Sequence, residues 1–490
     1  MNLFLILIPQ SLNSQFLNLA PCSHYDEDGV QKSELVLDQI TRSNIIEQMA
    51  VFYVRPAFAP QEGGVDLKPR SNDKIIQLLE KGVEIPNPLS LDIGDEVKID
   101  NISGNGVKIY PGCRIYGEEM VISGGAQIGY EGPVTIENCQ LGPNVELKAG
   151  YFKKAVFLEK ANMASGANVR DGCLLEEEAN GAHCVGLKQT ILFPFVTLGS
   201  LINFCDCLMA GGTSRKDHSE VGSAYIHFNF TPDGDKTTAS LIGDVPRGVM
   251  LNQPPIFLGG QGGMVGPVRM GYGNIVTAGT ILSNDVIRDN KLIIGKTHQG
   301  KIIDFIPRSY PRISRVVENN IIYLANLMAL EQWYVHVRHM FFRRQEFGEL
   351  IYNGALDKII LAKEERINRL TAMANNIAGS LEKKESGAST SGKREFCNNI
   401  TQVAELFNSE ILSRTDVDIR NRFLEGFHAH RKDHGGNYID IVQSLARSIS
   451  QRGTLWLDRI INELCLRTKE ILPLLGLFKK TAANFPNNEE

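Results

Sequence analysis

Aliphatic side chains recur at six-residue intervals through the middle of this chain, and this spacing restricts the fold more than any other feature. The residues between them are small, polar or turn-forming, and glycine is frequent. Pairs that show the interval are Ile93 and Ile99, Ile109 and Ile115, Leu141 and Leu147, and Met270 and Val276. Each interval accommodates one short strand and one tight corner, so three intervals close a triangular coil with the aliphatic side chains stacked inside. The spacing predicts a parallel β-helix over residues 86–305.

A β-sandwich with many turns is the alternative for the same region. A sandwich needs strands in which apolar and polar residues alternate over five or more positions, and most of these segments do not alternate. The repeat is imperfect between residues 180 and 265, so we expect loops that interrupt some coils there.

The rest of the 490-residue chain divides into two further regions. Residues 1–85 are a mixed N-terminal segment, with helical spacing over 33–54 and a helix from Asp73 to about Lys81 that Gly82 ends. Residues 306–480 show apolar side chains three and four apart, which predicts an α-helical bundle with a flexible loop near 380–397. We expect the bundle to cover the open end of the β-helix.

Charge and cysteine content exclude several classes of function. The formal net charge is −5 without a basic field, so we expect no nucleic-acid partner. The apolar run at residues 3–8 lacks a preceding basic residue and is too short to span a bilayer, so we expect no membrane insertion. The nine cysteines lack zinc or redox spacing, which predicts reduced thiols in a cytoplasmic protein. His428, His430 and His434 lie close together, and we interpret them as a solvated helix end rather than a metal site.

Polar side chains that could carry chemistry gather where the repeat is broken, between residues 183 and 266. His218 lies among charged residues in an irregular stretch, where functional residues concentrate. His227 alternates with Phe228 along a strand and has a second interpretation as a hydrogen-bonded core histidine. Asp206 and Asn203 have a second interpretation as residues that bond within a corner of the coil.

Several phrases in this region resemble the left-handed β-helix of the bifunctional UDP-N-acetylglucosamine pyrophosphorylase/glucosamine-1-phosphate acetyltransferase family. The segment "HFNFTPDGDKTTASLIGDV" is similar to that family's run of asparagine, tyrosine, aspartate and glycine followed by lysine, threonine and an isoleucine–glycine–aspartate corner. "LINFCDC", "GPV" and "AGT" resemble further phrases in the same order. The resemblance covers roughly residues 195–290, and the fold it implies is a left-handed parallel β-helix, here followed by an α-helical domain.

The resemblance implies a homotrimer that binds acetyl-CoA and a sugar phosphate or nucleotide-sugar between neighbouring subunits. A histidine is the general base, with His218 as the first candidate and His227 as the second, since a neutral imidazole suits that role near pH 7. Lys236 and Arg215 are implied as phosphate contacts, and Asn229 as the residue that orients the reacting amide. The full set of implied substrate and acyl-CoA contacts is Asn203, Asp206, Arg215, Lys216, Asn229, Phe230, Lys236 and Ala278.

These inferences predict a hexapeptide transferase that moves an acetyl group to an amino-sugar phosphate or nucleotide-sugar. The alternative is a non-catalytic scaffold or sensor that binds a nucleotide-sugar and acts through its helical domain. Phe230, which replaces the family's tyrosine, and the short spacing between His218 and Asn229 favour the alternative. Nucleotidyl transfer is not expected, because the family's phosphate-binding loop has no counterpart in residues 1–90.

Overall fold

The computed structural model describes residues 68–479 except 296–299, 301, 303, 382–387 and 409–416, together with two short strands nearer the N-terminus. These strands, β1 (His24–Tyr25) and β2 (Gln31–Lys32), pair antiparallel within a unit formed by Met1–Leu67. The predicted helical segment over 33–54 lies outside the described residues. Every other element belongs to a second unit, Lys68–Glu490.

The second unit opens with helix α2 (Asn72–Glu80), which confirms the helix predicted from Asp73. Its apolar face buries Ile75 and Leu78 against the first coil of a β-helix. Nζ of Lys74 donates hydrogen bonds to the backbone oxygens of Gly94, Asp95 and Val97 at 3.1, 2.6 and 2.7 Å. Helix α2 therefore covers the N-terminal end of the β-helix and satisfies backbone groups that an open end would expose.

The region that follows is a parallel β-helix whose coils have three faces. Face 1 contains β3 (Asp92–Ile93), β5 (Arg114–Tyr116), β8 (Val134–Glu137), β11 (Gly150–Lys153), β14 (Ala167–Val169), the first part of β17 (Gly186–Leu192) and of β19 (Asn203–Met209), β23 (Ile226–Phe228), β26 (Gly263–Val265) and β29 (Ile281–Leu282). Face 2 contains β6 (Val121–Ile122), β9 (Gln140–Leu141), β12 (Ala155–Phe157), β15 (Cys173–Leu175), the second part of β17 and β19, β24 (Ser240–Ile242) and β27 (Arg269–Met270).

Face 3 contains β4 (Lys108–Ile109), β7 (Gln127–Ile128), β10 (Glu146–Leu147), β13 (Asn162–Met163), β16 (Asn180–Gly181), β18 (Thr197–Leu198), β22 (Glu220–Val221), β25 (Phe257–Leu258), β28 (Ile275–Val276) and β30 (Leu292–Ile293). Each strand pairs in parallel with the strand one coil earlier and one coil later. The chain passes from face 1 to face 2 to face 3 and then begins the next coil. The predicted fold class, a parallel β-helix followed by an α-helical region, is confirmed.

Inward-facing side chains form continuous apolar columns inside the coils. On face 1 the paired inward positions are Ile93, Ile115, Ile136, Phe152, Val169, Leu187, Phe204, His227, Met264 and Leu282. All of them are buried. Stacking of like side chains from coil to coil explains the six-residue spacing of aliphatic residues in the sequence.

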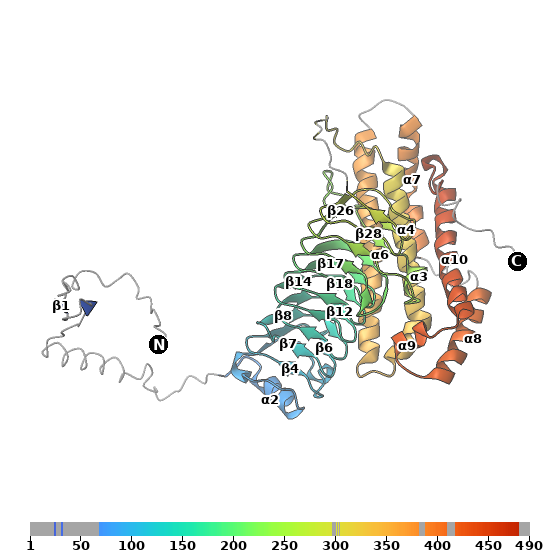
Figure 1. The fold of residues 1–490 in the computed structure, drawn as a ribbon. Helices are drawn as coiled ribbons and strands as arrows, with labels where there is room; N and C mark the ends of the chain where they lie inside the picture. Colours follow the sequence, from blue (N-terminus) through green and yellow to red (C-terminus); the bar gives the residue numbers. More distant parts are fainter. Residues whose placement is uncertain are drawn as a thin grey trace. The chain divides into compact units, whose positions relative to one another are not determined.

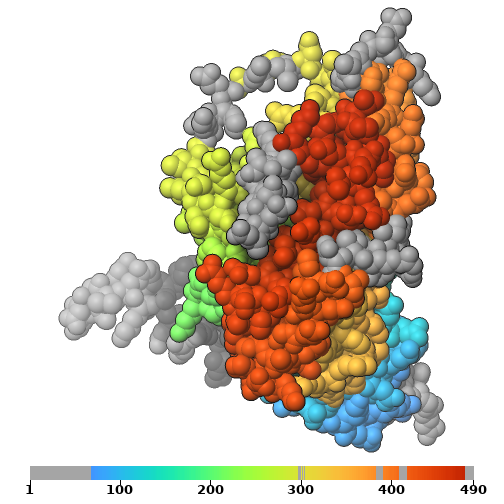
Figure 2. Space-filling view, turned by 90° about the vertical axis from the view of Figure 1, so that its right-hand side faces the viewer, coloured from blue at the N-terminus to red at the C-terminus, as the bar shows by residue number. Residues whose placement is uncertain are grey.

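Among the described residues, the elements that follow the β-helix are helical: α4 (Ile313–Trp333), a π-helical turn (Tyr334–Arg338), α5 (His339–Phe342), α6 (Gly348–Leu381), α7 (Ala388–Asn408), α8 (Val417–His434), α9 (Tyr438–Gln443), α10 (Arg447–Ile471) and a short 3-10 helix (Pro473–Leu475). Helix α6 packs on β9, β12 and β15, and α4 packs on β24. The helices thus lie along face 2, parallel to the stack of coils (Figure 1). The expectation that they cover the end of the β-helix is wrong. Figure 2 shows the helices as the surface of this side of the protein.

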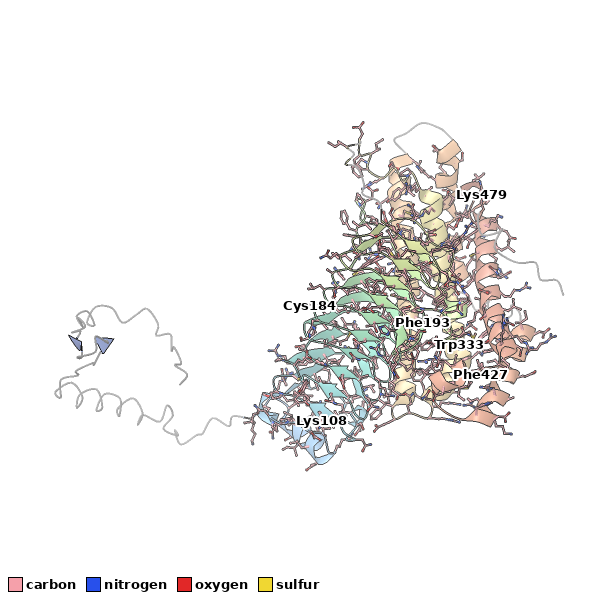
Figure 3. All side chains as sticks on the ribbon, viewed as in Figure 1. Lys108, Cys184, Phe193, Trp333, Phe427 and Lys479 are labelled. Carbon is pink, nitrogen blue, oxygen red and sulfur yellow. The ribbon has the colours of Figure 1, made fainter. Side chains whose placement is uncertain are left out.

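Face 2 carries apolar side chains on its outer surface as well as its inner one. The outward positions along β12, β15, β17, β19 and β24 are Val156, Leu174, Ile191, Leu208 and Leu241, and all are buried. Phe193, at the end of β17, lies between the coils and the helices (Figure 3). Strands of a sheet that is covered on both faces are apolar at successive positions, so the sequences of these strands indicate which face the helices cover.

Two further details concern the helical region. Residues 382–387, within the loop predicted near 380–397, lie outside the described residues, and α7 begins at Ala388. Within the described part of the chain, every helix is too short or too polar to cross a lipid bilayer.

Candidate functional site

The edge between faces 1 and 2 holds a buried ion pair. Strand β19 turns from one face to the other at Asp206, whose backbone has φ 60°. Nη2 of Arg366, on helix α6, lies 2.7 Å from Oδ1 of Asp206, and both side chains are buried. Burial raises the pKa of Asp206, while the Arg366 guanidinium and the Asn229 side chain act in the opposite direction. Asp206 therefore joins the β-helix to the helical layer.

The loop between β23 and β24, residues 229–239, runs along the same edge one coil further on. It carries Asn229, which is half-buried, and Phe230, which is 73% exposed. Lys236 is exposed, while its backbone oxygen accepts a hydrogen bond from Nη1 of Arg366 at 3.1 Å. Of the predicted contacts, Asp206, Asn229, Phe230 and Lys236 are thus brought together at one edge.

Two further cations lie on face 1 beside this edge. Strand register places Arg170 next to Lys188, and Lys188 is paired with Cys205. The positive charges of Arg170, Lys188 and Lys236 each lower the pKa of the Cys205 thiol, although burial raises that pKa by more. Among the described residues, none of the three cations has a carboxylate partner within ion-pair distance.

Arg170 and Lys188 were not among the predicted site residues. The sequence does contain a signal that could have predicted their proximity. Arg170, Lys188 and Cys205 are separated by 18 and 17 residues, which is the length of one coil. Residues that lie one coil apart in a β-helix stack in one column of side chains.

His218 lies at a different edge, between faces 2 and 3. It belongs to a small antiparallel hairpin formed by β20 (Gly212–Ser214) and β21 (Asp217–His218). Nδ1 of His218 lies 2.9 Å from the backbone oxygen of Arg215, and Nε2 lies 3.7 Å from Oε2 of Glu220. A carbonyl oxygen can only accept, so Nδ1 carries the proton and Nε2 is the basic nitrogen of the neutral imidazole. The His218 ring is partly exposed.

The same hairpin contains Arg215 and Lys216. Nη1 of Arg215 donates to the backbone oxygens of Glu178 and Phe195 and to Oγ1 of Thr197, at 3.0, 3.2 and 2.8 Å. Its guanidinium therefore fastens the hairpin to face 3. Lys216 is exposed at the tip of the hairpin.

His227 lies inside the β-helix, in the inward column between Phe204 and Met264. It is buried, and its Nε2 lies 2.7 Å from Oγ of Ser240. Burial lowers the pKa of His227 to about 4, and the Cys205 backbone opposes this in part. This placement matches the core interpretation of His227 and keeps its ring from any molecule bound at the surface.

The two remaining predicted contacts lie near the third edge, between faces 3 and 1. Asn203 is exposed at the start of β19, and Ala278 is exposed in the corner between β28 and β29. Cys184, in a corresponding corner, lies on the side of the coils away from the helices (Figure 3). The predicted site residues are therefore distributed over all three edges of one chain.

A metal site receives no support from the described residues. No group of three histidine, cysteine or acidic side chains lies close enough together in them to hold a metal ion. His430 and His434 stack on α8 with their ring centres 3.9 Å apart, and His430 is half-buried while His434 is exposed. The eight described cysteines are free thiols.

Comparison with curated proteins decides which known proteins the chain resembles. It is 27% identical to the bifunctional protein GlmU of Thermotoga maritima over 214 residues, which are 44% of this chain and 42% of that protein. It is 26% identical to GlmU of Trichlorobacter lovleyi over 225 residues, and 29% identical to GlmU of Pelobacter propionicus over 224 residues. This chain resembles GlmU.

The resemblance to GlmU confirms the one predicted from the phrases around residues 195–290, and the β-helix agrees with it. The matched part is 43% of the proteins from Trichlorobacter lovleyi and Pelobacter propionicus, and 46% and 45% of this chain. The chain therefore spans less than half the length of these GlmU relatives. No family model matches it.

Proposed function

We propose that this protein is a hexapeptide-type acyltransferase that transfers an acetyl group from acetyl-CoA to an amino sugar carrying a phosphate or nucleotide. The resemblance to GlmU and the β-helix support a transferase of this class. The observation that carries the proposal is the distribution of side chains over the edges. His218 is oriented as a base at one edge, and cations without carboxylate partners lie near another.

These groups can act on one ligand only if two copies of the chain contribute to the same site. His218 adjoins face 3, while Lys236, Arg170 and Lys188 lie on or beside face 1. Contact between face 3 of one copy and face 1 of the next brings the two sets together. A contact between two different surfaces closes into a ring, and a ring of three copies is our proposed assembly.

The outer surfaces of faces 1 and 3 support such a contact. Both become apolar in the last coils, whereas earlier coils carry polar residues at the same positions. On face 1 the exposed apolar residues are Ile226, Phe228, Val265 and Ile281, and on face 3 they are Phe257, Ile275 and Leu292, with exposures from 38% to 63%. Grouped exposed apolar side chains mark interaction surfaces. Face 2 is occupied by the chain's own helices, so the ring has to use faces 1 and 3.

The residues of face 1 also fit the chemical groups of acetyl-CoA. Phe230 and the apolar end of face 1 suit the pantetheine and acetyl groups, and Lys236 and Arg170 suit phosphates. Acetyl-CoA supplies the activated acyl group when bound. Nε2 of His218 takes a proton from the acceptor amine as the amine nitrogen bonds to the acetyl carbon, and the negative charge of Glu220 stabilises the resulting imidazolium. His218 returns this proton to the sulfur of the leaving group as the carbon–sulfur bond breaks, so that coenzyme A leaves as its thiol. Free thiols agree with the cytoplasmic location included in this proposal.

A scaffold or sensor that binds a nucleotide-sugar without chemistry is the second candidate. The burial of His227 favours it, because only one of the two predicted bases remains accessible. Phe230 also lacks the hydroxyl of the tyrosine that it replaces. The cations of face 1 would serve ligand binding equally in this case.

Thermal shift measurements with acetyl-CoA and with UDP-N-acetylglucosamine separate the two candidates, since a ligand stabilises the state that binds it. We expect acetyl-CoA to stabilise the protein and His218→Ala to abolish turnover, whereas His183→Ala, an exposed histidine at another edge, retains it. Stabilisation by the nucleotide-sugar alone, without turnover, would support the scaffold.

The assembly is tested by the molar mass in solution. We expect three copies for the natural chain and for Gln127→Glu, and a smaller species for Ile275→Glu. Gln127 and Ile275 occupy the same outward column of face 3, in a polar and an apolar coil respectively. A monomeric natural chain would contradict a site shared between copies.

A further inference from the structure

Among the contacts that fasten the loop of residues 229–239 are four hydrogen bonds, which come from side chains of helices α4 and α6 and from Tyr310, just before α4. Oη of Tyr310 donates to Oδ2 of Asp235 at 2.6 Å, and Nδ2 of Asn376 donates to the backbone oxygen of Asp233 at 3.0 Å. Nδ2 of Asn320 donates to the backbone oxygen of Thr237, also at 3.0 Å. Arg366 supplies the fourth contact, to the backbone oxygen of Lys236.

The loop has few interactions of its own that would fix its conformation. It contains no helix or strand, and Lys236 has φ 55°, a left-handed conformation that a lysine adopts only at a cost. Its internal hydrogen bonds are local and centre on Thr231 and Asp235. A loop with few contacts of its own opens more readily than the coils around it, so the external contacts determine its conformation.

Arg366 has the most consequential position among these contacts. One arm of its guanidinium is bound to Asp206 in one coil, and the other is bound to the loop of the next coil. The side chain is buried, so water does not compete for these hydrogen bonds. A planar guanidinium can bind two acceptors in fixed directions, whereas a lysine ammonium cannot reproduce that geometry.

We infer that Arg366 is a positioning residue, through which the helical layer sets the conformation of the loop that presents Asn229 and Lys236. The helices are then a structural part of the ligand site rather than an independent attachment. This inference rests on the proposed function for the identity of the ligand, but not for the effect on the loop.

Hydrogen exchange of the full-length protein tests the inference directly. In Arg366→Gln we expect amide exchange in residues 229–239 to rise by about tenfold or more, the effect of losing a hydrogen bond to a charged group. Exchange in the coils before residue 170 should remain unchanged. The matched control is Lys363→Met, which removes a partly buried ion pair between α6 and Glu331 of α4 at a distance from the loop. Equal exchange of the loop in Arg366→Gln and the natural chain would overturn the inference.

Two further variants and a ligand measurement complete the test. Asn376→Ala and Tyr310→Phe remove two other contacts of the loop and leave the Asp206–Arg366 pair intact. If Arg366→Gln does not fold, we expect loop exchange to rise in both of these variants, and unchanged exchange in both would contradict a loop held by the helical layer. We expect Arg366→Lys to recover only part of the protection, and the Kd of acetyl-CoA to rise in parallel with loop exchange. If the natural chain binds no ligand, the proposed function fails, and loop exchange alone decides the role of Arg366.

Discussion

Replacement of Arg338 by methionine should destabilise the protein more than the loss of any surface ion pair. Arg338 lies in the π-helical turn after α4, with a side chain 1% exposed, and its Nη2 is 2.7 Å from Oε1 of Glu177, which is 9% exposed. The guanidinium also lies 3.8 Å from the centre of the Tyr438 ring. Methionine fills most of the volume but leaves the Glu177 carboxylate buried without a cation.

The expected cost is about 3–5 kcal/mol in the free energy of unfolding, the range for a buried pair that loses one partner. Arg467 and Glu463 on α10 provide a matched control, because their atoms are 2.6 Å apart but their side chains are 34% and 30% exposed. Arg467→Met should cost less than about 1 kcal/mol. In Glu177→Met/Arg338→Met most of the stability should return, since both charges of the pair are removed together.

The pH dependence gives a second test of the same reasoning. Burial raises the pKa of the adjacent Glu176 to about 7, and Arg338 opposes this rise. The folded protein then binds more protons than the unfolded chain between the ordinary carboxyl pKa of 4.5 and pH 7, so this group makes stability fall as pH rises through that window. Without Arg338 the window extends upward, and Arg338→Met should therefore cost more at pH 8 than at pH 5.

Chemical denaturation followed by circular dichroism at the two pH values measures these quantities. Equal losses in Arg338→Met and Arg467→Met would refute the argument that burial, rather than distance, decides the strength of the pair. A double variant as unstable as Arg338→Met would refute the assignment of the loss to an unpaired carboxylate.

Two further predictions concern the core and the helix contact. Burial lowers the pKa of His227 to about 4, so between pH 6.5 and pH 4 the unfolded chain binds a proton at this residue that the folded protein does not. The natural chain should therefore lose stability relative to His227→Met as pH falls through this range. Thermal unfolding at pH 5 and pH 7 measures this loss, and parallel changes in both proteins would contradict it. A Cβ on Gly354 of α6 would lie 2.5 Å from Oε1 of Gln140, so Gly354→Leu should cost about 1–3 kcal/mol in the free energy of unfolding, measured by denaturation. A Cβ on Gly379 would meet its nearest atom, Nη1 of Arg308, at 3.9 Å, an ordinary contact, so Gly379→Leu should cost little. Equal effects of the two substitutions would contradict a close contact between α6 and face 2.

The fold was largely predictable because it depends on short-range periodicity. Six-residue spacing and helical spacing predicted the two kinds of architecture and the helix beginning near Asp73. The place of the helices along face 2 was missed, although strands such as Val156–Phe157 and Leu174–Leu175 carry two successive apolar residues. Such pairs indicate a strand covered on both sides, and an end cap would not require them.

The candidate site was less predictable, because neighbours in the sequence of a β-helix separate onto different edges. His218 and Asn229 are eleven residues apart in the chain and yet occupy different edges. The partner of Asp206 is Arg366, which is 160 positions away and shows no local pattern that would reveal it. His227 was predicted as the second candidate base, with a core histidine as the other interpretation, and its alternation with Phe228 is the signal that agrees with its buried position.

The outward-facing side chains of the three faces differ in polarity along the β-helix. Face 2 is apolar from Val156 to Leu241 and is covered by helices of the same chain. Faces 1 and 3 are polar in the earlier coils and carry exposed apolar side chains, among them Ile226, Ile281, Ile275 and Leu292, in the last ones. Exposed apolar side chains that group on one surface mark an interaction site. Helices of the same chain pack on face 2, so the ring that we propose, with face 3 of one copy on face 1 of the next, would cover both groups without displacing the helices.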